Sequence, residues 1–454
     1  MEFSAVILAA GKGTRMKSKY SKLVHRVAGK AIIEHVVAAV QAAGISKITL
    51  VLGHGREEIE ALFSGAAGIS FAVQAEQLGT GHALLQAVEY FTDQEKILVL
   101  AGDTPMLQAS TLQKFMDDYA TNAETAAVLS TRVVDAYGYG RIVRDEAGDF
   151  MRIVEEKDAD GTIKAIDEIN SGIYCFNAAE AFAALRNLSN DNAQQEYYLT
   201  DILEMLREQG RKVQCFCISA EEDIYGINDR RQLAKAEQIL RRRVNDRLML
   251  SGVTLIDPAS TLVDVGVKIG RDTIIYPNTI VEGHSCVGED CEIGPNTHIT
   301  DCSIGDAVRI ESSRLWQAEL GDACTIGPYA YLRPGTRLGS KVKVGDFVEI
   351  KKSLIGDGSK IPHLSYIGDA TIGSSVNIGA GTITCNYDGH NKFETILEDG
   401  VFIGSNCNLV APVRIGNHAV TGAGSTITRD VPAGSLGLER ADQKNIEHWQ
   451  EKKS

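Results

Sequence analysis

Hydrophobic residues follow two different periods in the two halves of this sequence. Up to about Tyr225, short apolar runs such as "SAVILAA", "KITLVLG" and "KILVLAGD" alternate with the helical patterns "AIIEHVVAAVQAAG" and "GHALLQAVEYF". Short apolar runs indicate strands, and apolar residues repeating at the helical period indicate helices packed on one face. The alternation predicts an α/β unit with a mostly parallel sheet and helices on both faces. Ligands of such sheets bind beyond the carboxyl ends of the strands.

The second half repeats with a period of six. Ile269, Ile275, Val281 and Val287 begin one such run, and two further runs extend from Ile326 to Ile350 and from Ile403 to Ile427, with Thr421 as the polar exception. A helix does not keep a period of six, and an alternating strand needs a period of two. A six-residue repeat predicts a parallel β-helix, in which each repeat supplies one short strand and one corner.

The repeat is interrupted once by a polar segment. Between Ile378 and Leu397 the period is lost, and "NYDGHNKFET" intervenes. An insertion in a stacked repeat has to leave the stack as a loop. Such a loop can be inert or can reach over a neighbouring surface, and its Asn, Tyr, His and Lys side chains favour the second interpretation.

A long helix is expected between the two halves. Asp229 can cap it, apolar residues recur at helical spacing, and Gly252 can end it. We therefore predict domains at 1–228 and 252–454, joined by a helix at 229–251. The basic run Arg241–Arg243 is expected to be a solvated helix face, with a phosphate-binding patch as the alternative.

Composition narrows the function classes. The 454 residues carry a formal net charge of −14, which argues against non-specific nucleic-acid binding. No run of 18 apolar residues predicts a membrane span, and the first residues lack a signal-peptide pattern. The nine cysteines form no C-x-x-C pair, so we expect free thiols and a cytoplasmic location.

The segment "LAAGKGTRM" carries the first candidate chemistry. It contains Gly11, Gly13 and Arg15, follows a strand signal, and precedes Lys22. It lacks the spacing of a P-loop and the third glycine of the dinucleotide-binding motif. Glycine lets a backbone approach a phosphate closely, and two cations can bind a triphosphate. On spacing alone, a glycine turn with surface cations is an equal alternative.

The surrounding motifs resemble the sugar-nucleotidyltransferase family. The resemblance rests on "LAAGKGTRM", "QAEQLGTGHA", "LAGDTP", "GYGRIV", "IVEEKD", "EINSGIY" and "GIND", although Ala31 replaces the proline of many relatives. It implies a Rossmann-like sheet, catalytic roles for Arg15 and Lys22, and Mg²⁺ held by Asp103 and Asn228. The nucleotide and sugar-nucleotide positions it implies are Leu8, Ala9, Ala10, Gly11, Gly13, Lys22, Gln74, Gly79, Thr80, Ala101, Gly102, Asp103, Gly140, Glu155, Asn170 and Asn228.

Motifs within the six-residue repeats extend the resemblance over nearly the whole chain. "YLRPGT", "EIKKS", "KIPHLSY", "NIGAGTITCNYDGHNK" and "VFIGSNCNLVAP" resemble the bacterial family of bifunctional uridyltransferase/acetyltransferase enzymes. This family implies a left-handed β-helix, with His363 as general base. The sugar-phosphate and acetyl-coenzyme A positions that it implies are Arg333, Lys351, Tyr366, Asn377, Ala380, Asn386, Tyr387, Lys392, Ser405, Ala423 and Arg440.

The resemblance implies a two-step enzyme. Its second half acetylates glucosamine-1-phosphate from acetyl-coenzyme A, and its first half transfers UMP from UTP to N-acetylglucosamine-1-phosphate, which releases pyrophosphate. The product, UDP-N-acetylglucosamine, feeds synthesis of the bacterial cell wall and outer envelope. The family also implies a homotrimer assembled through the β-helix. The alternatives are a nucleotidyltransferase with an inert or regulatory β-helix, and a non-catalytic scaffold.

Overall fold

A computed structural model describes residues 3–450. The chain divides into two compact units, residues 1–240 and 241–454, and the dividing point lies within helix α8 (Arg230–Leu250). Within residues 3–450, no helix is long and apolar enough to cross a lipid bilayer, and all nine cysteines are free.

The first unit is built on a nine-stranded sheet whose main order is β11–β7–β10–β6–β1–β4–β5. Strands β6, β1, β4 and β5 are parallel, β11 is parallel to β7, and β10 is antiparallel to both β6 and β7. The predicted mostly parallel sheet is therefore confirmed, with β10 as the central exception. The strands are β1 (Phe3–Ala9), β4 (Ile48–Leu52), β5 (Ile69–Val73), β6 (Lys96–Ala101), β7 (Ala126–Arg132), β8 (Arg141–Arg144), β9 (Phe150–Val154), β10 (Glu168–Asn177) and β11 (Val213–Ile218).

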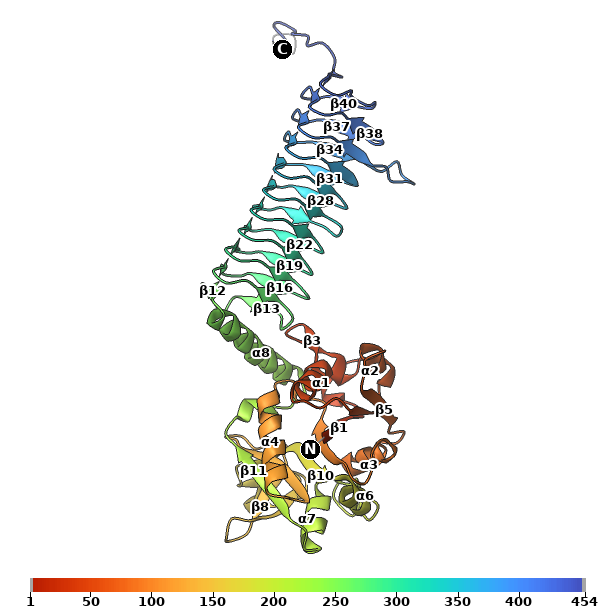
Figure 1. Ribbon diagram of the computed structural model, residues 1–454, viewed down its shortest axis with the longest axis vertical. Helices are drawn as coiled ribbons and strands as arrows, with labels where there is room; N and C mark the ends of the chain where they lie inside the picture. Colours follow the sequence, from red (N-terminus) through yellow and green to blue (C-terminus); the bar gives the residue numbers. More distant parts are fainter. Residues whose placement is uncertain (1–2, 451–454) are drawn as a thin grey trace. The chain divides into compact units, whose positions relative to one another are not determined.

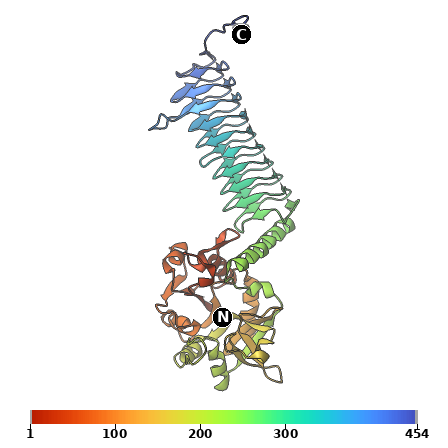
Figure 2. The same ribbon diagram turned by 180° about the vertical axis from the view of Figure 1, so that it is seen from behind.

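Helices pack around this sheet, as Figures 1 and 2 show. The predicted helix "GHALLQAVEYF" is shorter than expected, because α3 ends at Leu85 and a separate 3-10 turn covers Val88–Tyr90. The Tyr90 hydroxyl donates a hydrogen bond to the Phe71 carbonyl of β5 (2.6 Å), which ties this turn to the sheet. The helices are α1 (Ile32–Ala42), α2 (Arg56–Leu62), α3 (Thr80–Leu85), α4 (Ala109–Thr121), α5 (Gly161–Lys164), α6 (Ala178–Leu185) and α7 (Asp201–Glu208).

The order of the parallel strands brings three predicted motifs to one edge. Strands β1, β5 and β6 end immediately before Ala10, Gln74 and Gly102, and these strands lie within the contiguous order β6–β1–β4–β5. Carboxyl ends of parallel strands share one edge of the sheet. The glycine loop, the "QAEQLGTGHA" segment and the "LAGDTP" segment therefore converge there.

The second unit is a β-helix made of three parallel sheets with 11, 10 and 9 strands (Figure 1). The first sheet runs from β12 (Thr254–Leu255) to β41 (Leu436–Gly437), the second from β13 (Leu262–Val263) to β40 (Thr426–Ile427), and the third from β14 (Lys268–Ile269) to β38 (Val413–Ile415). Up to β38, successive strands of the chain visit the three sheets in turn, so each of these coils contributes one strand to each sheet. This is the predicted architecture, the left-handed β-helix of the hexapeptide-repeat class.

The repeat residues form a continuous apolar core inside the coils. Ile275, Ile293 and Ile350 have no exposed surface, and burial of each such side chain contributes roughly 1.5–3 kcal/mol relative to exposure. Thr421 occupies a repeat position as the polar exception and is also buried. Its hydroxyl accepts a hydrogen bond from the Gly404 backbone N–H (3.1 Å), which removes the penalty for burying it.

The polar insertion leaves the stack between β34 (Ile383–Cys385) and β35 (Thr395–Leu397), and the hairpin-like projection is visible in Figure 1. A bridge pairs Tyr387 with Lys392 across the loop. The Asp388 carboxylate accepts hydrogen bonds from the backbone N–H groups of His390 (2.8 Å) and Asn391 (2.6 Å). The loop therefore has ordered contacts within itself.

Helix α8 confirms the predicted long helix. The Asp229 carboxylate accepts hydrogen bonds from the backbone N–H groups of Arg231 (2.8 Å) and Gln232 (2.9 Å), so it caps the helix as expected. The expected solvated face is wrong at Arg241, whose side chain is 15% exposed and lies 3.7 Å from the Asp264 carboxylate.

Candidate active sites

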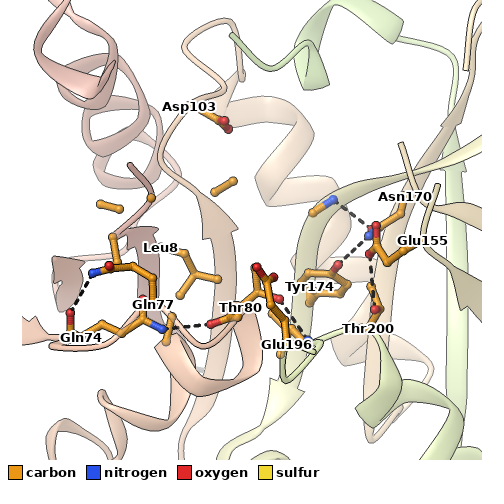
Figure 3. Close-up of a pocket in the computed structure, with 18 of the residues that line it drawn as sticks. Leu8, Gln74, Gln77, Thr80, Asp103, Glu155, Asn170, Tyr174, Glu196 and Thr200 are labelled. Carbon is orange, nitrogen blue, oxygen red and sulfur yellow. Dashed lines mark hydrogen bonds between the residues drawn. The ribbon is translucent and has the colours of Figure 1, made fainter. Parts of the chain in front are cut away.

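A pocket of about 370 Å³ lies at the carboxyl edge of the first unit's sheet (Figure 3). Most of the predicted nucleotide and sugar positions line it, and they come from β1, β5, β6, β9, β10 and the loops that follow them. These lining residues are Leu8, Ala9, Ala10, Gly11, Lys22, Gln74, Gly79, Thr80, Ala101, Asp103, Glu155 and Asn170. Gly13, Arg15, Gly102, Gly140 and Asn228 are not among its lining residues.

Two glycines of the glycine loop differ in what a side chain at their position would meet. Gly13 has a positive φ of 57°, and a Cβ there would lie 2.6 Å from the Cβ of Lys22. Glycine at this position therefore lets Lys22 approach the loop. A Cβ on Gly11 would meet no protein atom within 4 Å. Gly11 lines the pocket, so the space beside it is open to a ligand.

Two of the pocket's lining residues, Lys22 and Asp103, form a cluster with Arg15 and Asn228, which lie outside its lining. The Lys22 ammonium lies 2.6 Å from Asp103 Oδ2 and 3.4 Å from Asn228 Oδ1. Arg15 donates to the same Asn228 oxygen (2.9 Å). The side chains of Lys22 and Asp103 are 13% and 22% exposed, so this ion pair is largely shielded from water. The predicted catalytic pair and the predicted metal pair thus form one cluster.

The opposite end of the pocket presents polar groups suited to a sugar. Asn170 donates to the Tyr174 hydroxyl (2.7 Å), and its backbone N–H donates to the Gly140 carbonyl (2.8 Å). The Glu155 carboxylate accepts a hydrogen bond from the Thr200 hydroxyl (3.4 Å), and burial raises the pKa of this carboxyl. Gly140 lies behind this group, since a Cβ there would reach 3.4 Å from the Glu155 oxygens.

Sequence reasoning missed several residues of the pocket wall. Gln77 and Ala83 lie inside the motif "QAEQLGTGHA", and Gly172 and Tyr174 lie inside "EINSGIY", but no role was predicted for them. Glu196, Leu199 and Thr200 come from the segment before α7, outside the motifs that carried the resemblance. The missed residues are Leu23, Gln77, Ala83, Gly172, Tyr174, Glu196, Leu199 and Thr200. The nearest signal was "EYYLTD", a polar and aromatic run without repeat or helical period.

In the second unit, the predicted sugar-phosphate residues gather at one corner of the β-helix. Arg333 donates to Glu349 (2.7 Å), and Asn386 donates to Asp369. The neighbouring Lys392 amine lowers the pKa of Lys351, with smaller effects from burial and from Arg333. A Cβ on Gly368 would lie 2.5 Å from the Tyr366 hydroxyl and 2.9 Å from Asn386 Nδ2, so this glycine leaves room for both side chains. This corner joins the second sheet to the third.

His363 lies at a different corner, between the first sheet and the second. It ends β30 (Lys360–His363), pairs with Asp346 of β27 (Lys343–Asp346), and its Nδ1 is 2.6 Å from Asp346 Oδ1. This hydrogen bond lowers the pKa of the Asp346 carboxyl. The His363 side chain is 56% exposed, so its other ring nitrogen can reach a ligand.

Four of the predicted acetyl-coenzyme A residues stack along the same corner as His363, whereas the fifth, Lys392, lies on the inserted loop beside Lys351. The Ala380 carbonyl accepts from Asn406 N–H (2.6 Å), and the Ser405 carbonyl accepts from Gly424 N–H (2.8 Å), which places Ala380, Ser405 and Ala423 in successive coils. The Arg440 guanidinium donates to the Ala423 carbonyl (3.1 Å). Asn377 lies on this face, in β33 (Asn377–Ile378), which pairs with β30.

Comparison with known proteins matches both units. The MobA-like NTP transferase domain model matches residues 5–209, and the bacterial transferase hexapeptide (six repeats) model matches residues 266–301 and 394–429. The chain is 61% identical to the bifunctional protein GlmU of Syntrophomonas wolfei, over 98% of this chain and 99% of that relative. It is 52% identical to the bifunctional protein GlmU of Carboxydothermus hydrogenoformans, with the same coverage. The chain belongs to the bifunctional GlmU family.

Membership of the GlmU family confirms the predicted family and the predicted bifunctional transferase. The nucleotidyltransferase match lies in the first unit and the hexapeptide match in the second, as the two hydrophobic periods indicated. A solved UDP-glucose pyrophosphorylase in complex with UDP-glucose covers 54% of the chain, with 17% sequence identity and a TM-score of 0.46.

Proposed function

We propose that the chain makes UDP-N-acetylglucosamine in two steps at two separate sites. The second unit acetylates the amine of glucosamine-1-phosphate from acetyl-coenzyme A. The first unit then joins the product to UMP from UTP and releases pyrophosphate. The observation that carries this proposal is that each unit gathers its own set of reactive groups, Lys22 with Asp103 in one and His363 with Asp346 in the other.

The first site suits phosphoryl chemistry that needs charge neutralisation rather than a general base. Arg15 and Lys22 are the cations that would bind the triphosphate. Asp103 and Asn228 direct one oxygen each toward the same cation, the Lys22 ammonium, so the pair fits a divalent ion as well. Mg²⁺ accepts few protein oxygens and completes its shell with phosphate and water. Bound there, it would supply charge stabilisation at the α-phosphate.

The remaining lining groups would orient the two substrates in this pocket. Gln74, Gly79 and Thr80 lie on the side where the nucleobase would bind, and Glu155 with Asn170 on the side of the sugar. Holding the sugar phosphate in line with the α-phosphorus converts a bimolecular reaction into an effectively unimolecular one.

The second site suits general-base catalysis. The hydrogen bond between Nδ1 of His363 and Asp346 orients the ring and leaves Nε2 to take a proton from the sugar amine. Asp346 also stabilises the imidazolium that results. Arg333 and Lys351 provide the positive charge for the sugar phosphate, and Asn386 with Tyr366 would contact the sugar or the acetyl group.

We also propose that the second site is completed in a homotrimer. The sugar-phosphate residues and His363 lie at different corners of one β-helix, as described above. In a trimer of parallel β-helices, one corner of a chain can face a different corner of its neighbour. The loop that contains Tyr387 and Lys392 would then reach the seam where Ala380, Ser405, Ala423 and Arg440 bind acetyl-coenzyme A.

Two substitutions test the proposed function. With the wild-type chain, we expect thiol release from acetyl-coenzyme A that depends on glucosamine-1-phosphate, and pyrophosphate release that depends on UTP, N-acetylglucosamine-1-phosphate and Mg²⁺. Asp103→Asn should abolish pyrophosphate release and preserve acetylation, and His363→Ala should do the reverse. If either variant lost both activities while remaining folded by circular dichroism, the proposal of two independent sites would be wrong.

A further inference from the structure

We infer that His82 is a positioning residue that fixes the amide of Gln74 and so makes the nucleotide site prefer uracil to cytosine. This inference rests on the proposed function of the first unit. Gln74 directly follows β5, is 3% exposed, and lines the pocket beside Thr80 (Figure 3). Its side chain is buried, so its orientation is set by protein partners rather than by water.

The Gly79 carbonyl decides which end of the Gln74 amide faces it. Gln74 Nε2 is 3.0 Å from this oxygen. The carbonyl is held by the first turn of α3, where the Ala83 N–H also donates to it (3.1 Å). Gly79 itself has a φ of 113°, and a Cβ there would lie 2.6 Å from the Tyr197 carbonyl, so its backbone has little freedom. A carbonyl oxygen only accepts, so the NH₂ end of Gln74 must point toward it.

His82 takes the second hydrogen of the same NH₂ group. Its Nδ1 lies 3.0 Å from Gln74 Nε2. A nitrogen that faces an NH₂ group must accept, which places the ring hydrogen on Nε2. On the other side of the ring, Gln86 Nε2 is 3.3 Å from His82 Nε2 and donates to the His82 carbonyl (3.1 Å). A neutral imidazole has one lone pair for these two amides. Gln86 is half-buried and can turn to water, whereas Gln74 cannot, so the lone pair belongs to Gln74.

As a consequence, the Gln74 side chain can only accept a hydrogen bond from a base in the pocket. Both N–H groups of Gln74 are used by Gly79 and His82, so Oε1 is the atom left for a ligand, and none of residues 3–450 donates to it. Uracil carries an N3–H donor for this acceptor. Cytosine carries a lone pair at N3, and two facing acceptors leave a buried polar atom unpaired. Thymine has the same N3–H as uracil, so His82 does not distinguish these two bases.

Three substitutions of His82 separate positioning from a merely structural role. His82→Asn can place an amide oxygen where Nδ1 lies. His82→Gln reaches only the position of Nε2, and His82→Phe keeps the ring shape without an acceptor. We would measure kcat/KM for UTP, CTP and TTP with N-acetylglucosamine-1-phosphate and Mg²⁺ for each variant. Thermal unfolding and the acetylation rate of the second unit serve as checks on folding.

We expect the ratio of kcat/KM for UTP over CTP to fall by about tenfold or more in His82→Phe and His82→Gln, because one acceptor instead of two then holds the NH₂ end of Gln74, and an amide that turns over presents an N–H to cytosine N3. The ratio should stay within about twofold of wild type in His82→Asn. The ratio of UTP over TTP should be the same in all four proteins.

An equal loss of kcat/KM for all three nucleotides, or an unchanged ratio of UTP over CTP in both His82→Phe and His82→Gln, would overturn the inference. So would a failure of His82→Asn to retain the ratio that the other two variants lose. If the wild-type chain itself released no pyrophosphate, the proposed function would be wrong, and this outcome is distinct from any change in the nucleotide ratio. If His82→Phe does not fold, the comparison of His82→Gln with His82→Asn decides.

Discussion

Burial controls the charge of two carboxyls near the sugar end of the first pocket. Burial raises the pKa of Glu155, and burial together with the nearby Glu204 and Asp158 raises the pKa of Asp201 to about 6. Glu155 lines the pocket, whereas Asp201 begins α7 directly after the pocket residue Thr200. The pKa of Asp201 therefore reflects the electrostatics beside the pocket, although Asp201 is not one of the lining residues.

Because the pKa of Asp201 is raised, ionisation of this carboxyl should lower the free energy of unfolding of the first unit. Between the ordinary value of 3.8 and about 6, the folded chain binds more protons than the unfolded chain, so the free energy of unfolding falls as pH rises through this range. Asp201→Asn should stabilise the first unit by about 1 kcal/mol at pH 7.5, after allowance for solvent screening, and the gain should shrink as pH falls and vanish below about pH 3.8. Thermal unfolding at several pH values measures this, with Glu208→Gln at the exposed end of α7 as the control. A gain that does not change with pH would contradict the assignment.

At the second site, the proposed role of Arg333 predicts that its substitution changes KM for one substrate and not for the other. If its guanidinium binds the sugar phosphate, Arg333→Met should raise KM for glucosamine-1-phosphate by about tenfold or more and leave KM for acetyl-coenzyme A unchanged. Glucosamine without the phosphate, assayed as a poor substrate, should react equally with both proteins. A parallel loss with glucosamine would mean that Arg333 supports the corner through Glu349 rather than binding the phosphate.

At the scale of structural elements, some corners of the β-helix bring the backbones of successive coils into close contact. A Cβ on Gly404 would lie 2.6 Å from the Ala423 backbone nitrogen and 2.6 Å from the Thr421 carbonyl of the next coil. A Cβ on Gly424 would meet nothing within 4 Å, although its φ of 76° favours glycine. Gly404 is therefore needed for the close approach between coils, whereas Gly424 is needed for its backbone conformation.

This contrast predicts different stabilities for two alanine variants. Gly424→Ala should destabilise the second unit by about 1 kcal/mol, the cost of a left-handed residue with a Cβ. Gly404→Ala should cost about 3 kcal/mol, the upper part of the range for overpacked sites, because backbone atoms cannot rotate away. Denaturant unfolding of the two variants compares them. Equal losses would show that the coils can separate at this corner.

The sequence predicted elements well where a period is imposed by packing. The six-residue repeat follows directly from the inward position of Ile275 and its equivalents, and the polar loop follows from the break in that repeat. Thr200 and Tyr174 were not predicted as pocket residues, because their place depends on how the segment before α7 folds against β10. The early end of α3 was also missed, since the hydrogen bond of Tyr90 to β5 is a tertiary contact that overrides a helical pattern.

For the whole molecule, the two proposed sites differ in the share of their residues that a single chain supplies. The first pocket brings Lys22, Asp103, Glu155 and Asn170 together within one unit. In the second unit, hydrogen bonds and charge effects connect the predicted residues within each corner. We therefore expect one chain to be sufficient for uridylyl transfer and acetyl transfer to require corners from two chains.

This difference predicts that two inactive chains can restore one another. His363→Ala and Lys351→Met should each lose acetylation as homotrimers. In mixed trimers purified through a different tag on each chain, one seam in three, or about a third of the sites, combines an intact His363 with an intact Lys351. Acetylation should recover to about that fraction of wild type, with pyrophosphate release unchanged throughout. Trimers mixed from Arg333→Met and Lys351→Met should gain no activity over the Arg333→Met homotrimer, because both changes lie at the same corner of their chains. Recovery in neither mixture would place the whole acetyl-transfer site within one chain.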